Sequence, residues 1–171
     1  MDNLIQPNGP KAGGTVIPND RQIEVLGHFY ALNHKGGFVY RQGIRRLAKG
    51  SGKSPFAAAM CLFELLGPCR YDGFDRHAPF GVRAKPMSMP LVQIVATSES
   101  QTANTIRMVR AFCQKKGPLA RKYDLEVAKT FIETPGGGKL QQMTSSAHSM
   151  EGGEVSFVVG DELEHWLPAQ G

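Results

Sequence analysis

Apolar residues recur at helical spacing in three stretches of the chain. After Pro18, a helix capped by Asn19 or Asp20 is predicted to run toward the glycines at 36–37, with an apolar face. A second helix is predicted over residues 55–66, because a broad apolar face there is stopped by Gly67 and Pro68. A third follows the capping box formed by Ser98 and Gln101.

The remaining apolar runs have the length and composition of strands. Residues 91–97 form a clear β-rich run, and residues 125–132 and 140–145 flank a glycine-rich turn at 135–138, which predicts a hairpin. Residues 155–160 form another β-rich run. Residues 38–48 have a poorer strand pattern, with three arginines, and we expect a strand there because of the loop it leads into. Residues 67–90 are rich in proline and glycine, which predicts a long loop or irregular hairpin.

This order of elements predicts an α/β fold with right-handed crossovers onto a mostly parallel sheet flanked by helices. Ligands of such sheets bind at the carboxyl ends of the strands. Residues 1–17 carry several glycines and prolines with little periodicity, so we expect them to form a loose N-terminal arm.

A glycine-rich segment, residues 49–54 (KGSGKS), opens the second predicted helix. Glycines let a backbone curl so that its N–H groups face an anion, and a helix N-terminus favours negative charge. Lys53 would then reach the β- and γ-phosphates of a nucleotide, and Ser54 would bind Mg²⁺. The usual phosphate loop has a further glycine where this chain has Leu47, so the motif needs independent support.

A second motif lies near the other end of the chain. The run at 155–160 ends in Asp161 and Glu162. A strand that delivers Asp161 to a magnesium ion and Glu162 toward a water is what a phosphate-loop ATPase requires. A buried strand that runs into an acidic surface turn is the simpler alternative for this segment alone. The two motifs in this order favour nucleotide binding.

Gln22 lies in the first turn of the first predicted helix. In several ATPase families, a glutamine upstream of the phosphate loop reads the edge of adenine, since its amide offers both a donor and an acceptor. A solvated glutamine at a helix start is the alternative reading.

Composition sets broad limits on the protein. The chain has 171 residues, of which 41% are hydrophobic and 20% charged, as expected for one globular domain. Neither a membrane span nor a signal peptide is evident, so we expect a soluble, intracellular protein. Three cysteines without Cys-x-x-Cys spacing argue against a disulfide framework or a zinc site.

The charge is asymmetric along the sequence. The formal net charge of +5 combines a basic front with an acidic segment from residue 124 onward. This distribution is consistent with a polyanionic partner, whether nucleotide or nucleic acid, or with ordinary solvated charge. Lys115, Lys116, Arg121 and Lys122 surround a turn that could contact DNA, although a solvated basic loop is the simpler reading.

Four stretches together resemble the large subunit of tailed-phage terminases, the ATP-driven motor that packages viral DNA. They are residues 45–54 (RRLAKGSGKS), 95–101 (VATSESQ), 144–153 (TSSAHSMEGG) and 157–166 (FVVGDELEHW). The last stretch looks especially like terminases of phages that infect actinobacteria. The resemblance covers roughly residues 18–167, and it implies a phosphate-loop NTPase fold of the RecA-like (ASCE) type.

The resemblance also assigns roles to residues. Phosphate loops of this family commonly lack the first glycine and carry a basic residue, usually arginine, where this chain has Lys49. That residue is proposed to stabilise the γ-phosphate, although lysine lacks the bidentate fork of arginine. Gln22 matches the adenine-recognition motif. ATP-binding residues would be Gln22, Gly50, Ser51, Gly52, Lys53 and Ser54; Ser54 and Asp161 would hold Mg²⁺, and Glu162 would activate water.

Family members continue after the acidic strand with further sheet strands and a nuclease domain. The resemblance therefore implies that residues 18–171 are a C-terminally truncated ATPase domain. The implied partners are double-stranded viral DNA, the terminase small subunit, the portal protein and further copies in a ring, without a membrane. The implied location is the host cytoplasm, transiently at the procapsid portal.

Two alternatives remain open at this stage. The chain could be a fragment that binds nucleotide or a partner without turnover. It could also be a relative of RecA-like helicases, which share both motifs but not the segment before the acidic strand.

Overall fold

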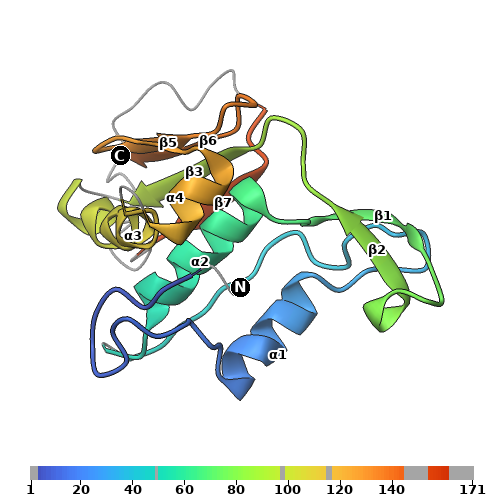
Figure 1. Cartoon of the computed structure of the whole chain (residues 1–171). Helices are drawn as coiled ribbons and strands as arrows, with labels where there is room; N and C mark the ends of the chain where they lie inside the picture. The colour runs from blue at the N-terminus through green and yellow to red at the C-terminus, as the bar shows by residue number, and fades with distance from the viewer. Residues whose placement is uncertain (1–3, 49, 97–98, 115–116, 145–153, 162–171) are drawn as a thin grey trace, which may run out of the picture.

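The computed structural model describes residues 4–48, 50–96, 99–114, 117–144 and 154–161. These residues form a mixed α/β fold (Figure 1). The elements are α1 (Asp20–Phe29), α2 (Lys53–Leu66), β1 (Arg70–Phe74), a 3₁₀ turn η1 (Pro79–Gly81), β2 (Val82–Lys85), β3 (Leu91–Ala96), α3 (Glu99–Phe112), α4 (Pro118–Tyr123), β4 (Glu126–Val127), β5 (Phe131–Glu133), β6 (Lys139–Thr144) and β7 (Phe157–Gly160).

The main sheet has five strands in the order β4-β5-β6-β3-β7. Strand β3 pairs in parallel with both β6 and β7, whereas β5 is antiparallel to β4 and to β6. The sheet is therefore mixed: the neighbouring strands β6, β3 and β7 run parallel, as expected, whereas β5 runs antiparallel to both of its neighbours. The tight turn before β6 explains the difference, because a short hairpin can join only antiparallel strands.

Helices α2 and α3 lie side by side and pack on the sheet (Figure 1). Their contact faces carry small and branched side chains, among them Ala58, Leu62 and Val109, which meet Ile94 and Leu140 of the central strands. This core fixes the starts of both helices relative to the ends of β3 and β7. Both predicted sequence motifs lie at those positions.

No strand forms over residues 39–48 in the described structure, so the strand predicted to lead into the glycine loop is wrong. The segment is irregular after a single bridge between Leu32 and Phe38. Arg41 and Arg46 are exposed, and Ile44 is 89% exposed. The pattern has too few apolar positions to cover two faces of a sheet, as its three arginines already indicated.

Other expectations are refined. Strand β3, helix α3 and the hairpin of β5 and β6 are confirmed, and residues 67–90 form an antiparallel ribbon of β1 and β2. The first helix ends earlier than expected, at Phe29. Residues 125–132 divide into two short strands, and helix α4 was not predicted.

From residue 4 on, the expected loose arm makes ordered contacts, since Leu4 is buried in the core and Ile5 bridges Thr15.

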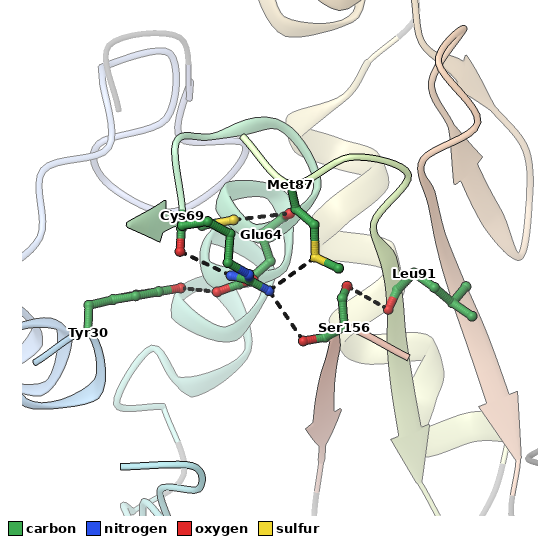
Figure 2. Close-up of polar contacts among 7 residues, drawn as sticks. Tyr30, Glu64, Cys69, Met87, Leu91 and Ser156 are labelled. Atoms are coloured by element: carbon green, nitrogen blue, oxygen red, sulfur yellow. Dashed lines mark hydrogen bonds and ion pairs between the residues drawn. The ribbon is translucent and has the colours of Figure 1, made fainter. Parts of the chain in front are cut away.

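A buried carboxylate joins three parts of this fold. Glu64 of α2 is 2% exposed, and its Oε1 accepts a hydrogen bond of 2.7 Å from the Tyr30 hydroxyl. Its Oε2 accepts from Arg70 Nη1 at 2.8 Å. Arg70 also donates to the carbonyl oxygen of Ser156, just before β7, at 3.4 Å (Figure 2). Burial and the neighbouring Glu64 carboxylate raise the pKa of Tyr30 far above its usual range, so its hydroxyl remains a donor.

The cysteines have no disulfide partner and are all buried. Burial raises the pKa of Cys113 to about 12, which keeps the thiol neutral at physiological pH. The described cysteines therefore act as core residues.

Replacing Arg70 by alanine should leave Glu64 buried without its ion-pair partner. We expect Arg70→Ala to lower the free energy of unfolding by roughly 3 kcal/mol, the cost of stranding a buried charge. Urea unfolding followed by circular dichroism measures this change. The control is Lys139→Ala, because Lys139 and Glu133 form a half-exposed pair at 3.9 Å whose loss should cost less than about 1 kcal/mol. Equal losses in the two variants would contradict the central role of Glu64.

Candidate functional site

The glycine loop has the backbone conformation that its sequence predicts. Gly50 and Gly52 have φ angles of 81° and 80°, in the left-handed region that favours glycine. A Cβ atom added at either position would meet nothing within 4 Å, so the loop surface there is open. Gly52 is the N-cap of α2 and provides no side-chain cap, which leaves the first amides of the helix for another acceptor.

Lys53 is the first residue of α2 and points back over the loop. Its Nζ donates a hydrogen bond of 2.9 Å to the carbonyl oxygen of Leu47. That bond holds the ammonium group next to the loop, where an anion bound by the amides could replace Leu47 as its partner. Ser54 follows in the first turn of α2 and is half-buried.

Asp161 is placed directly after β7. Its backbone N–H donates to the carbonyl oxygen of Val95 at 3.0 Å, which extends the parallel pairing of β3 and β7 by one step. Its Oδ2 accepts a hydrogen bond of 2.5 Å from the hydroxyl of Thr105. Thr105 belongs to α3 and is fully buried. The carboxylate is therefore held through one oxygen, and its Oδ1 remains without a protein donor in the described structure.

One cavity of about 810 Å³ brings the two predicted motifs together. Lys53 and Asp161 both line it, from the start of α2 and the end of β7. Residues 41–47 form the opposite wall and add arginines, of which Arg45 places its guanidinium 4.7 Å from the ring centroid of Phe56. The cavity thus combines several cations with one carboxylate, a combination suited to a polyphosphate and a metal ion.

A second cavity, of about 290 Å³, also adjoins the glycine loop. Gly50, Ser51 and Gly52 line it together with Gln22 of α1. The structure therefore brings Gln22 to the same cavity as the glycine loop. Gln22 also has a local role, since its Oε1 accepts from the backbone N–H of Asn19 at 2.9 Å in a capping box.

Some predicted residues cannot be placed. Lys49 and Glu162 lie outside the described residues, as do Lys115 and Lys116. Arg121 and Lys122 are exposed on α4, and Lys122 lies over the ring of its neighbour Tyr123. Within the described ranges, no three metal-binding side chains cluster together and no helix is long and apolar enough to span a membrane.

Sequence reasoning missed two residues of the site. No sequence pattern indicated a role for Thr105, because threonine is common on amphipathic helices. Its hydrogen bond to Asp161 forms only in the folded chain. Gln6, which lines the smaller cavity, lies in the segment expected to be a loose arm. No local pattern places either of them.

The left-handed glycines of the loop should resist substitution. We expect Gly52→Ala to lower the free energy of unfolding by about 1–2 kcal/mol, because a Cβ is disfavoured at a positive φ. The control is Gly136→Ala, since Gly136 also has open space but no positive φ, and there the change should be neutral or slightly stabilising. Denaturant unfolding of both variants measures these changes. A free energy of unfolding that is unchanged in Gly52→Ala would contradict the requirement for glycine at this positive φ.

Comparison with known proteins places the chain among phage proteins. No protein-family model matches it. The Gene 13 protein of Mycobacterium phage L5 is 39% identical over 151 residues, covering 88% of this chain and 25% of that protein. The Gene 13 protein of Mycobacterium phage D29 is 39% identical over 150 residues, covering 88% and 24%. The chain thus spans about a quarter of the length of these relatives.

A solved structure shares the fold. The large terminase of bacteriophage HK97 aligns with a TM-score of 0.65 at 13% sequence identity, over 92% of this chain and 28% of that chain. At this identity the likeness concerns the fold alone. The chain therefore has the mixed α/β fold of part of a terminase chain, and its sequence relatives come from mycobacteriophages, in agreement with the expected relation to phages of actinobacteria.

Proposed function

We propose that this chain is the nucleotide-binding ATPase part of a phage terminase large subunit, with a phosphate-loop NTPase fold. The observation that carries the proposal is the shared cavity of Lys53 and Asp161 beside a loop with two left-handed glycines. The fold of a terminase chain and the mycobacteriophage relatives support the same reading.

The described residues suit a magnesium nucleotide. Mg²⁺ prefers oxygen ligands and keeps several waters, and Ser54 and Asp161 offer a hydroxyl and a carboxylate oxygen. Thr105 already occupies Asp161 Oδ2, which leaves Oδ1 for an ion. When bound, the ion would neutralise charge on the phosphate oxygens. The open space beside Gly50 and Gly52 allows a phosphate close to the backbone amides.

The proposed reaction is transfer of the γ-phosphoryl group of ATP to water. The water oxygen bonds to the γ-phosphorus as the bond to the β–γ bridging oxygen breaks, giving ADP and phosphate. Lys53 and the loop amides would stabilise negative charge on the phosphates. Glu162 would orient the water and take its proton, and Lys49 would contact the γ-phosphate, as in the family motif. Glu162 directly follows Asp161 in the sequence.

In the whole motor this hydrolysis would drive double-stranded viral DNA into a procapsid. The proposed partners are the viral DNA, the terminase small subunit, the portal protein and further copies of the large subunit in a ring. The proposed location is the host cytoplasm and, transiently, the procapsid portal. These proposals concern the activity of a whole terminase large subunit, since the chain spans about a quarter of the length of its mycobacteriophage relatives.

Mg-ATP should stabilise the folded chain if the loop binds phosphate. At a ligand concentration 100 times the Kd, the gain is about 2.7 kcal/mol, or a rise in Tm of roughly 5–10 °C. We expect Lys53→Ala to lose this rise. The control is Lys129→Ala, because Lys129 is exposed and lies on neither cavity. Thermal unfolding with increasing Mg-ATP provides the measurement.

The outcomes separate the competing readings. No shift in the native chain would overturn nucleotide binding. A shift accompanied by phosphate release that Glu162→Gln abolishes supports the ATPase, whereas a shift without release supports a nucleotide-binding fragment without turnover. DNA strand separation driven by ATP would favour a helicase relative.

Thr105 should act on the metal site through Asp161. We expect Thr105→Val, which keeps the side-chain shape, to raise the Mg²⁺ concentration needed for half of the ATP-induced Tm shift by about tenfold. That loss corresponds to one hydrogen bond to a charged group. Thr105→Ser keeps the hydroxyl and should restore the midpoint. A lower Tm without ligand, at an unchanged Mg²⁺ midpoint, would instead indicate a purely structural role.

A further inference from the structure

The smaller cavity is lined both by apolar residues and by the polar side chains of Gln6, Asn19, Gln22 and Ser51. Val16, Ile17 and Pro18 approach from the N-terminal segment, and Phe56 and Ala59 from α2. Ile17 is 83% exposed at the rim, so a flat ring inserted there would cover apolar surface that is now in water. The cavity adjoins the phosphate loop, so a base attached to a loop-bound triphosphate could occupy it.

Within the described structure, the Nε2 group of Gln22 is the part of its amide that makes no hydrogen bond. Its Oε1 is taken by the Asn19 backbone N–H at 2.9 Å. In the described structure its Nε2 donates to no protein acceptor. Donation from Gln22 Nε2 could meet N7 of either adenine or guanine, so that contact does not by itself select adenine.

Gln6 offers this cavity a hydrogen-bond acceptor, which complements the Nε2 donor of Gln22. Its Nε2 donates to the carbonyl oxygen of Asn8 at 3.2 Å, and its Oε1 accepts from no described residue. Its backbone is fixed by hydrogen bonds with Gly13 and Gly14, of 2.9 Å and 2.8 Å. Nearby Leu4 is 5% exposed and anchors the segment in the core. Gln6 is therefore an acceptor held at the same cavity as Gln22.

We propose that Gln6 is a specificity-determining residue that selects adenine over guanine in this cavity, paired with Gln22. This inference rests on the proposed function of the phosphate loop. The exocyclic N6–H of adenine would donate to Gln6 Oε1, and the adjacent ring nitrogen would accept from Gln22 Nε2. Guanine carries the acceptor O6 where adenine has its amino group, so it would place one acceptor against another.

Nucleotide selectivity tests the inference. In titrations with Mg-ATP and Mg-GTP, followed by calorimetry, the native chain should bind ATP at least about tenfold more tightly, the discrimination typical of a paired hydrogen-bond contact. Gln6→Leu removes the acceptor and should bring the ratio of the two Kd values near one. Gln6→Glu keeps an oxygen acceptor and should retain the preference for ATP.

A third variant reverses the polarity of the contact. Gln6→Lys replaces the acceptor by a donor, so the preference should shift toward GTP. Any general effect of the introduced charge on the triphosphate acts on both nucleotides and cancels in the ratio. Because Gln6→Glu and Gln6→Lys differ mainly in this polarity, they test the inference even if Gln6→Leu fails to fold.

Gln22→Glu isolates the donor half of the pair. Glutamate keeps the oxygen that caps α1 but removes both N–H donors, so the helix should be retained while both nucleotides bind more weakly. An ATP-to-GTP ratio that stays unchanged in every Gln6 variant would overturn the inference and leave the proposed function standing. Absence of any binding that depends on Lys53 would overturn both.

Discussion

The buried carboxylate of Glu64 constrains the rest of the structure. A charge within the core is tolerated only if it is paired and hydrogen-bonded, so Arg70 and Tyr30 must stay on its two oxygens. Through these bonds α2 is tied to the end of α1, and Arg70 extends the network to the chain just before β7. Figure 2 shows this junction of segments that lie far apart in the sequence.

The elements joined in this way carry the candidate site. Gln22 lies on α1, Lys53 begins α2, and Asp161 follows β7. Glu64 lies three turns along α2 from Lys53, roughly 16 Å at the rise of a helix. The charged network therefore stands apart from the open loop while it sets the relative positions of the three elements. A site made of residues from separate elements needs such a framework, because small displacements weaken recognition and catalysis.

Helix α2 borders both cavities with its first turns. The smaller cavity is also lined by Gln6 and Gln22, and the larger one by Asp161. Phe56 lines both cavities and is 8% exposed, so it forms the wall between them. A base and a triphosphate could thus be held by the same short segment. The terminase-like fold and the relatives in mycobacteriophages make this arrangement consistent with the proposed ATPase.

The sequence by itself determined the local features. The apolar run of β3, the capping of α1 by Asn19, the stop of α2 at Gly67 and the hairpin before β6 depend on neighbours in the chain, so their patterns could be read directly. The same holds for the positive φ angles of the glycine loop. The candidate residues Lys53 and Asp161 were found because each belongs to a short motif.

Only the tertiary structure decided the features that depend on distant partners. A strand was expected over residues 38–48, but in the described structure this segment does not join either sheet. The tertiary structure gave Glu64 its partners and gave Asp161 its contact with Thr105, 56 positions away in the chain. It also placed Gln6 at the same cavity as Gln22. No local pattern encodes these pairs, because burial and hydrogen bonding between them exist only after the helices have packed on the sheet.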